Sequence, residues 1–335
     1  MKTVAQLSEQ ERKELFSETA TAMGVTAAAA EKDFWICWVL LHVFEDETLS
    51  QYLRFKGGTS ISKCYNAIER FSEDIDLILD WTQLTKEDPS DKSRSKTKQG
   101  KLNQSINEQA QAYIAETLLP RLIELMGATC ELAIDEQDPH TVNITYPKAF
   151  SSEYLRPQVR LEIGPLAAML PMELRDIQPY AADHFPDVFK SASVPVPTIV
   201  VARTFWEKLT ILHAEAHRPG DKALPIRYAR HYYDVYRLVE SGLSQQALEQ
   251  VDLLSEVVAF KQKFYPSGWA NYGSATLEGL ILQPSAHHID SLKTDYEQMQ
   301  EMLFGDKPSF EDILETLTTL ENAVHALAEI EETRK

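Results

Sequence analysis

Two nearby segments carry the strongest pattern in the chain: Phe55-Lys56-Gly57-Gly58-Thr59-Ser60, with a glycine pair, and Glu73-Asp74-Ile75-Asp76-Leu77-Ile78-Leu79, with a pair of acids. Tyr52–Lys56 alternates apolar and polar side chains, which predicts a strand that leads into the glycines. Thr59 or Ser60 can cap a short helix through about Tyr65. The second segment alternates as well, so the sequence predicts a strand, a turn, a short helix and a second strand.

The second strand has a polar face made of two acids. The side chains of Ile75, Leu77 and Leu79 point to one side, so Asp74 and Asp76 share the other. Same-face neighbours lie roughly 6.5–7 Å apart. Carboxylates at this spacing can hold two divalent ions about 3.5–4 Å apart for in-line phosphoryl displacement, and Mg²⁺ suits such oxygen ligands. The alternative is an exposed strand edge with two solvated acids.

The glycine turn before the acids suits a phosphate group. Gly57 and Gly58 allow positive φ and the close approach of a ligand to backbone amides. Thr59 and Ser60 at a helix start present hydroxyls and free N–H groups to an anion. Lys63 can add a point charge near the same end. The alternative is an ordinary Gly-Gly turn with a capping residue, but its combination with the acid pair favours a phosphate and metal site.

A third acid comes from the later segment Val159-Arg160-Leu161-Glu162-Ile163. Alternation places Arg160 and Glu162 on the face opposite the apolar residues. If this strand lies beside the Asp74–Asp76 strand, Glu162 completes a carboxylate triad and helps to activate the attacking hydroxyl. The alternative is an ion pair with a basic residue across the strands or on the same face.

Two polar residues of the C-terminal half lie at the edges of apolar helix faces. Lys208 lies between Phe205 and Leu212, so its side chain either snorkels outward or reaches a triphosphate. Asp234 borders a similar apolar row, and its alternative role is an i,i+3 pair with Arg237.

The remaining pattern predicts an α/β half and a helical half, with domains at residues 1–200 and 201–335. Proline-studded residues 165–197 are expected to be irregular. The chain from Lys92 to Lys101 contains no acid and is expected to be a loop, either solvated or in contact with phosphates. Expected helices cover Ala27–Glu45, Asn103–Met126, Ala202–His217, Ala229–Glu240, Gln245–Phe264 and Phe310–Glu332. Further strands are expected at Cys130–Ile134, Thr141–Tyr146 and Gln158–Ile163.

Composition narrows the class of protein. The chain has 335 residues, of which 44% are hydrophobic and 25% charged, as in soluble globular proteins, and its length favours two lobes. A formal net charge of -18 argues against broad electrostatic capture of nucleic acid. The apolar run Phe34–Leu41 is too short to span a bilayer and follows no basic segment, so neither a membrane nor a signal peptide is expected. Three scattered cysteines fit a reducing cytoplasm.

These motifs together resemble the AbiEii/AbiGii toxin family of nucleotidyltransferases, a branch of the DNA polymerase β-like superfamily. The matching segments cover roughly residues 31–240. They are Glu31-Lys32-Asp33-Phe34-Trp35, Phe55 to Lys63, Arg70 to Leu77, Arg160-Leu161-Glu162-Ile163, Glu207-Lys208-Leu209 and Arg230-His231-Tyr232-Tyr233-Asp234-Val235.

The resemblance implies a fold and a set of roles. The fold is α/β (α+β): a polymerase β-like nucleotidyltransferase core with a mixed sheet and flanking helices, closed by a helical C-terminal domain. Thr59 and Ser60 would bind phosphate, Asp74 and Asp76 would bind metal, and the active-site residues Lys208 and Asp234 would be essential.

The resemblance also implies an activity. Family members are toxins of toxin–antitoxin or phage-defence loci, and some transfer nucleotides to the 3′ ends of tRNA, whereas GTP binding is known for others. The expected activity is therefore Mg²⁺-dependent transfer of a nucleoside monophosphate from an NTP to tRNA, in a protein paired with a separately encoded antitoxin. Two alternatives stay open: an acceptor hydroxyl on a protein or small molecule, and an NTP-binding interaction module without catalysis.

Overall fold

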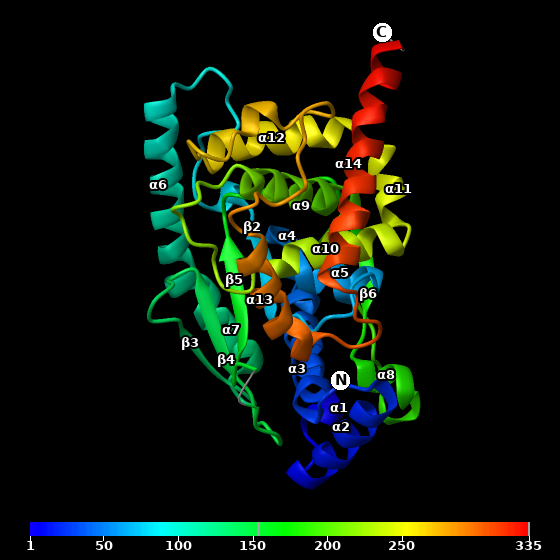
Figure 1. The fold of residues 1–335 in the computed structure, drawn as a ribbon. Helices are drawn as coiled ribbons and strands as arrows, with labels where there is room; N and C mark the ends of the chain where they lie inside the picture. The colour runs from blue at the N-terminus through cyan, green and yellow to red at the C-terminus, as the bar shows by residue number, and fades with distance from the viewer. Residues whose placement is uncertain (153–154, 334–335) are drawn as a thin grey trace. The chain divides into compact units, whose positions relative to one another are not determined.

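The computed structural model describes residues 1–152 and 155–333 and divides into two compact units (Figure 1). Unit 1 comprises Met1–Tyr65 and Phe71–Ile199, and unit 2 comprises Asn66–Arg70 and Val200–Lys335. Unit 1 holds a seven-stranded sheet, whereas the described elements of unit 2 are helical. No helix within the described residues is long and apolar enough to cross a membrane.

The sheet of unit 1 has the strand order β3-β4-β5-β2-β1-β7-β6. The pairs β2–β5 and β1–β7 are parallel and the other neighbours are antiparallel, so the expected mixed sheet is confirmed. The strands are β1 (Leu53–Lys56), β2 (Asp74–Leu79), β3 (Glu131–Ile134), β4 (Thr141–Thr145), β5 (Val159–Gly164), β6 (Met172–Ile177) and β7 (Val194–Ile199).

The central helix of unit 1 is α3 (Ala27–Glu45), as its apolar spacing predicts. Thr26 caps its start, and Trp35 is fully buried and stacks on Tyr146 with ring centroids 5.3 Å apart. The other helical segments of unit 1 are α1 (Lys2–Ala5), α2 (Glu9–Met23), α4 (Glu47–Tyr52), α5 (Gly57–Tyr65), η1 (Trp81–Gln83), α6 (Lys96–Tyr113), the π-helical η2 (Ile114–Leu118), α7 (Leu119–Met126), α8 (Tyr180–His184) and η3 (Pro186–Val188).

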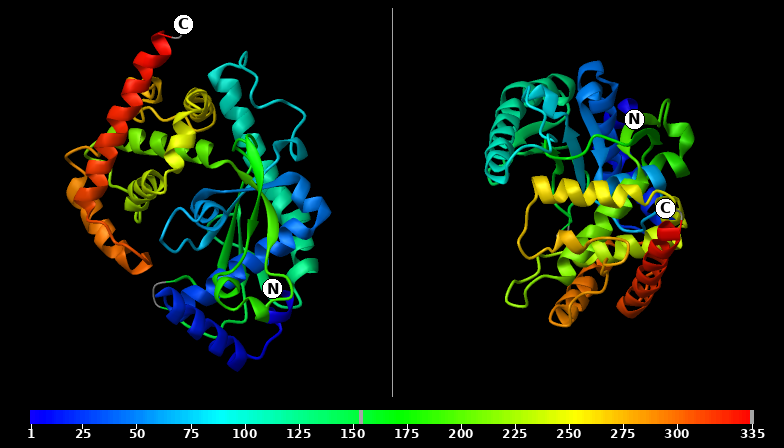
Figure 2. Two further views of the ribbon diagram at one scale, coloured as in Figure 1. Left: turned by 90° about the vertical axis from the view of Figure 1, so that its right-hand side faces the viewer. Right: turned by 90° about the horizontal axis from the view of Figure 1, so that it is seen from above.

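Unit 2 is built around α9 (Val201–Ala216), whose Trp206 is fully buried and donates its indole N–H to the carbonyl of Ala247 at 3.1 Å. Figure 2 gives two further views of these helices. The others are α10 (Ala229–Glu240), α11 (Leu243–Leu248), α12 (Asp252–Phe264), η4 (Tyr272–Ser274), α13 (Ile289–Met299), η5 (Gln300–Met302) and α14 (Phe310–Thr333).

The proline-studded region from 165 to 197 is more regular than predicted. It contains β6, α8 and β7, so the expectation of an irregular excursion is wrong. Pro195 and Pro197 lie within β7 itself. Proline removes one N–H donor but its fixed φ is compatible with a strand, and the buried side chains of Val194 and Val196 keep β7 in the sheet.

Two helix predictions also need correction. The basic run was expected to be a loop, but α6 begins inside it at Lys96, where the Ser95 hydroxyl accepts from the Lys98 amide. The chain from Gln245 to Phe264 was expected to be one helix, but it forms α11 and α12.

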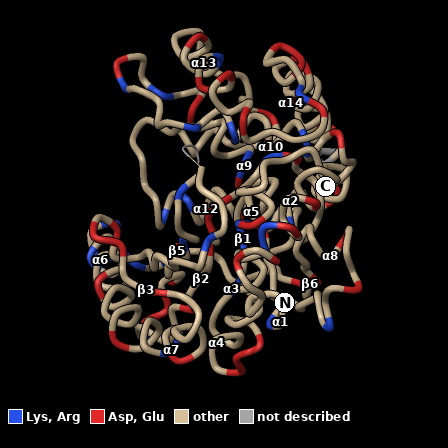
Figure 3. The backbone as a smooth tube through the Cα atoms, turned by 90° about the horizontal axis from the view of Figure 1, so that it is seen from below, with Lys and Arg blue, Asp and Glu red and all other residues tan. Residues whose placement is uncertain are grey.

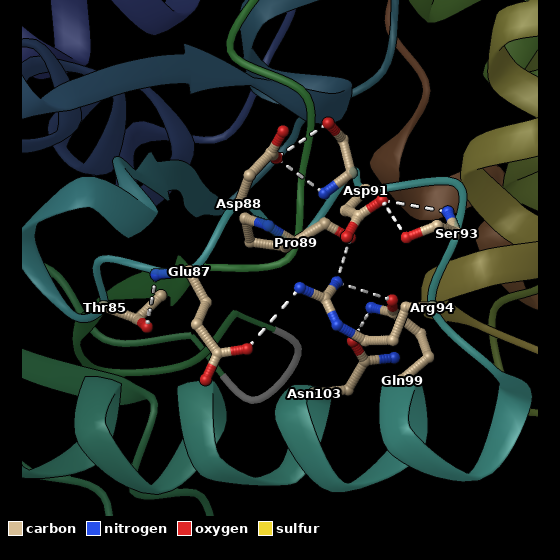
Figure 4. A network of polar contacts seen from close by, with 10 residues as sticks. Thr85, Glu87, Asp88, Pro89, Asp91, Ser93, Arg94, Gln99 and Asn103 are labelled. Atoms are coloured by element: carbon tan, nitrogen blue, oxygen red, sulfur yellow. Dashed lines mark hydrogen bonds and ion pairs between the residues drawn. The ribbon is translucent and has the colours of Figure 1, made fainter.

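Arg94, within the basic run, lies in a network of polar contacts rather than in solvent (Figure 4). Its guanidinium donates to the Gln99 side chain at 3.1 Å and lies 3.5 Å from the carboxylate of Glu87. Only 10% of its side chain is exposed. Arg94 therefore holds the loop before α6 together, and the exposed basic side chains of this run are Lys92, Lys96, Lys98 and Lys101.

Candidate active site

The parallel pairing of β2 with β5 brings three acids of unit 1 to one face of the sheet. Asp74 lies opposite Arg160, and Asp76 lies opposite Glu162. The residues between them, Ile75 and Leu161, are fully buried on the other face. The condition set by the sequence, that the Glu162 strand lies beside the Asp74–Asp76 strand, is therefore confirmed.

The carboxylates on this face are not fully balanced by protein groups. Oδ1 of Asp74 is buried and has no hydrogen-bond partner among the described residues. Burial, together with the charge of Glu73, raises the pKa of Asp74. Burial and then the charges of Asp74 and Asp76 raise the pKa of Glu162 to about 7. Arg160 lies 3.4 Å from Glu162, so that acid forms an ion pair as well as facing the other two.

Gly57 makes room for the Asp76 carboxylate. Its φ is +82°, in the region that favours glycine, so Gly57 uses the positive φ that the sequence allows at both glycines, whereas Gly58 does not. A Cβ at Gly57 would overlap the carboxylate of Asp76. Helix α5 starts at this glycine, so its first amides lie at the same place as the acid face.

Thr59 and Ser60 do not cap the helix as predicted, because α5 already begins at Gly57. Both side chains are buried. The Thr59 hydroxyl bonds with the carbonyl oxygen of Asp74 and, at 2.9 Å, with the hydroxyl of Ser72. The Ser60 hydroxyl donates to the Gly57 carbonyl at 2.9 Å. These hydroxyls therefore tie α5 to the acid-bearing strand and to its own first turn.

Lys63 is committed to a buried ion pair elsewhere in unit 1. Its ammonium lies 2.8 Å from Asp33 of α3 and 3.9 Å from the ring centroid of Tyr180. Only 5% of its side chain is exposed. The structure thus places the Lys63 charge on Asp33, whose other oxygen accepts from the Tyr180 amide at 2.7 Å.

Lys208 and Asp234 meet within unit 2. The Lys208 ammonium donates to Oδ2 of Asp234 at 2.7 Å, and both side chains are buried. A snorkelling Lys208 is therefore excluded. The alternative pair of Asp234 with Arg237 is also wrong, because Arg237 lies 3.0 Å from Glu69.

Two ion pairs, Arg70–Asp234 and Lys32–Glu73, were missed by reasoning from the sequence. Arg70 forms two hydrogen bonds with Asp234, at 2.6 and 2.9 Å. Lys32 pairs with Glu73 at 2.8 Å, and this glutamate also accepts from the Arg156 amide at 3.0 Å. The available signal was that Arg70, Lys32 and Glu73 all lie inside the family-like motifs, but nothing in the sequence indicates their partners.

The model of the AbiEii family, described as "Nucleotidyl transferase AbiEii toxin, Type IV TA system", matches residues 38–316. The chain belongs to this family. It is therefore a nucleotidyltransferase toxin of a type IV toxin–antitoxin system, which confirms the resemblance drawn from the motifs.

Solved structures similar to this AbiEii-family chain include MenT4, a nucleotidyltransferase toxin from Mycobacterium tuberculosis H37Rv, at 17% identity and a TM-score of 0.41, covering 96% of this chain and 99% of that one. JHP933 from Helicobacter pylori has 14% identity and a TM-score of 0.45, covering 92% and 97%. No curated protein sequence matches the chain.

An AbiEii-family enzyme implies an NTP substrate and a divalent ion, and the donor set can be tested against that ion. Among the described residues, no three His, Cys, Asp or Glu side chains form a ready-made metal cage. Magnesium, however, is usually bound through one or two carboxylates, with waters and substrate phosphates completing its shell. Asp74, with its unsatisfied buried Oδ1, and Asp76 on the same face fit that mode of binding.

Proposed function

We propose that this toxin transfers a nucleoside monophosphate from an NTP to an acceptor hydroxyl, most favourably at the 3′ end of tRNA, with two Mg²⁺ ions. The observation that carries the proposal is the acid face of unit 1. It joins Asp74, Asp76 and Glu162 beside the start of α5, and one buried carboxylate oxygen there has no hydrogen-bond partner within residues 1–152 and 155–333. Such a face is costly to keep in an apo protein unless a cation completes it.

The reaction forms a bond between the acceptor oxygen and the α-phosphorus and breaks the bond from that phosphorus to pyrophosphate. Asp74 and Asp76 would hold the magnesium ions, with Glu162 as the third acid of the same face, and the ions would supply positive charge that offsets the charge on the phosphates. Glu162 also helps to activate the acceptor hydroxyl. Its pKa of about 7 allows its carboxylate to take up a proton near neutral pH.

We assign the phosphate contacts to the start of α5 and to Lys208. The backbone amides of Gly57, Gly58, Thr59 and Ser60 form a helix N-terminus, which favours an anion. Lys63 supports this helix through Asp33 and does not contact phosphate directly, because its ammonium is already paired. Lys208 neutralises charge on the triphosphate, and Asp234 orients Lys208 through their 2.7 Å contact.

The acceptor must be found by a chain of net charge -18. Local basic surface is available at the start of α6, where Lys92, Lys96 and Lys98 are exposed; the lysine positions of α6 are drawn blue in Figure 3. The overall acidity favours a second candidate acceptor, a hydroxyl of a protein or a small molecule. A toxin of this family also implies a separately encoded antitoxin as its partner.

The test is to incubate the protein with each α-labelled NTP, Mg²⁺ and total tRNA, and then to separate RNA, protein and small-molecule fractions. Label in tRNA that disappears after 3′-end blocking supports the proposal. Label in the protein or small-molecule fraction shows the second candidate. No labelled product with any NTP, while the protein binds an NTP, would indicate a binding module without catalysis.

A further inference from the structure

Arg70 of unit 2 forms two hydrogen bonds with the Asp234 carboxylate through its guanidinium. Nε donates to Oδ1 at 2.6 Å and Nη2 donates to Oδ2 at 2.9 Å. The same Oδ2 accepts from the Lys208 ammonium at 2.7 Å. The exposed fractions of these side chains are 4% for Arg70, 0% for Asp234 and 8% for Lys208. One buried carboxylate is therefore shared by two cations.

The sharing matters because the two cations keep the buried Asp234 ionised, while burial lowers the pKa of Lys208 and the charge of Asp234 opposes that shift. Burial alone would raise the pKa of Asp234, but Arg70 and Lys208 outweigh it and hold that pKa well below its ordinary value. The neighbouring His231 offers no further charge at neutral pH, since burial and the charges of Lys208 and Arg230 lower its pKa well below the usual range. The two hydrogen bonds from the planar guanidinium also fix the orientation of the carboxylate. A single contact with an ammonium would leave the carboxylate free to rotate.

The backbone of Arg70 is held in place without help from Asp234. The segment Asn66–Arg70 forms part of unit 2, where Arg70 makes a β-bridge with Leu303. The Glu69 carbonyl accepts from the Phe304 amide at 2.9 Å. Arg70 therefore approaches Asp234 from a fixed base.

We propose that Arg70 is a positioning residue for nucleotide binding. It fixes the orientation of Asp234 and takes up part of its charge, so that Lys208 keeps positive charge for the triphosphate of an NTP. This inference rests on the proposed role of Lys208. Without Arg70, Asp234 would pair with Lys208 alone, and the ammonium would be neutralised by the protein instead of by the substrate.

The test is a titration of wild type and variants with MgATP, MgCTP, MgGTP and MgUTP by calorimetry, followed with the tightest-binding NTP. Lys208→Met and Arg70→Gln should each weaken binding by roughly tenfold or more, the scale expected for one hydrogen bond to a charged group. Adding Asp234→Asn to Arg70→Gln should restore most of the affinity, because the competing carboxylate charge is gone. A residue that only stabilises the fold gives no such rescue.

Arg237→Gln is the matched control. It breaks an Arg–carboxylate pair on the same short segment, at Glu69, without touching Asp234, so NTP affinity should stay at the wild-type value. If Arg70→Gln does not fold alone, Asp234→Asn is compared with the Arg70→Gln/Asp234→Asn double variant, in which no buried carboxylate is left unpaired. Equal affinities support the inference and a further loss overturns it.

The outcomes separate this inference from the proposed function. If Lys208→Met binds the NTP as wild type does, or wild type binds none, the assignment of Lys208 to the triphosphate fails and the role of Arg70 fails with it. If Lys208→Met binds weakly but Arg70→Gln binds normally, only the Arg70 inference is overturned. Weak binding by Arg70→Gln without rescue by Asp234→Asn also overturns it.

Discussion

Glu73 and Asp74 are adjacent in the sequence, yet their carboxylates have opposite surroundings. Glu73 accepts from the Lys32 ammonium at 2.8 Å and from the Arg156 amide at 3.0 Å. Oδ1 of Asp74 is also buried but has no hydrogen-bond partner in the described part of the chain. Protein groups therefore satisfy the Glu73 carboxylate, whereas one oxygen of Asp74 is left without such a group among the described residues. We infer that acids paired inside unit 1 stabilise the fold, whereas the acids of the acid face bind a divalent ion.

The largest effect is expected from a substitution of Asp76 on the acid face. Asp76→Ala should reduce nucleotidyl transfer by roughly a thousandfold, because removing a metal carboxylate takes away several kcal/mol of transition-state stabilisation. Its melting temperature should change little, because Asp76 lies at a partly exposed position of β2 and not in the core. Transfer rates at saturating Mg²⁺ and a thermal melt measure both quantities. A folded variant that keeps more than a few per cent of the activity contradicts the metal assignment.

Lys32→Met should give the opposite pattern. It removes the ammonium that pairs with the buried Glu73 carboxylate, and breaking such a pair costs about 3–5 kcal/mol of unfolding free energy, measurable by urea titration. Replacing both partners, as in Lys32→Met/Glu73→Leu, should recover much of that loss. A Lys32→Met variant within about 1 kcal/mol of wild type would show that this pair does not stabilise unit 1.

Gly57→Ala tests whether the space beside the Asp76 carboxylate matters for activity. The added Cβ would push the Asp76 carboxylate aside, and displacement on the scale of 1 Å can cost roughly a hundredfold in rate. The positive φ adds about 1 kcal/mol of strain. Gly242→Ala is the matched control, since Gly242 also has a positive φ but open space around its Cβ position. Equal transfer rates for the two variants would show that Gly57 matters only for its backbone conformation.

A smaller effect is expected from the basic run. Replacing Lys92, Lys96 and Lys98 by Gln should weaken tRNA binding. Its logarithmic salt slope should fall by about 0.7–0.9 for each phosphate that the variant no longer neutralises. NTP affinity should not change. Arg94 is left intact because it holds the loop together.

The control for that experiment replaces three other exposed lysines of unit 1, Lys86, Lys148 and Lys190, so that net charge changes equally. If both triple variants shift the salt slope by the same amount, the effect is one of net charge, and the start of α6 is not a tRNA surface.

The smallest effect concerns Glu162. Its folded pKa of about 7 lies above the ordinary value near 4.3, so its ionised form destabilises the apo protein. The penalty is absent below about pH 4, grows between the two pKa values and is complete above about pH 7. Glu162→Gln should therefore raise the free energy of unfolding at pH 8 but not at pH 4, by at most about 1 kcal/mol because the side chain is partly exposed, and the melting temperature at pH 8 should rise with it. A lower melting temperature at pH 8 would show that its pair with Arg160 dominates.

Local pattern predicted much of unit 1 because its strands alternate strictly. The bounds of α3 and β2 follow from spacing alone, and so does the shared face of Asp74 and Asp76. The pairing of β2 with β5 was conditional in the sequence, because strand order depends on contacts between distant segments.

The surroundings of each charge could not be predicted from local pattern. Arg70 and Asp234 are separated by 164 residues, and Lys63 and Asp33 by 30, so no periodicity reports either pair. Burial decides which charged side chains are consumed inside the protein, and burial is a property of packing between elements. The prediction that residues 165–197 are irregular failed for a similar reason. A high density of proline indicates turns, but the buried valines of β7 hold that strand in the sheet.

The most direct test of the central claim is the binding of Mn²⁺ alone, followed through the electron paramagnetic resonance signal of the free ion. Wild type should bind Mn²⁺, and Asp74→Asn and Asp76→Asn should each weaken binding by roughly tenfold or more, because each removes one charged ligand. Asp80→Asn, which changes an acid just beyond the same strand that caps η1, should bind as wild type does. Equal Mn²⁺ affinity in all four proteins would contradict the claim that the acid face is completed by a divalent ion.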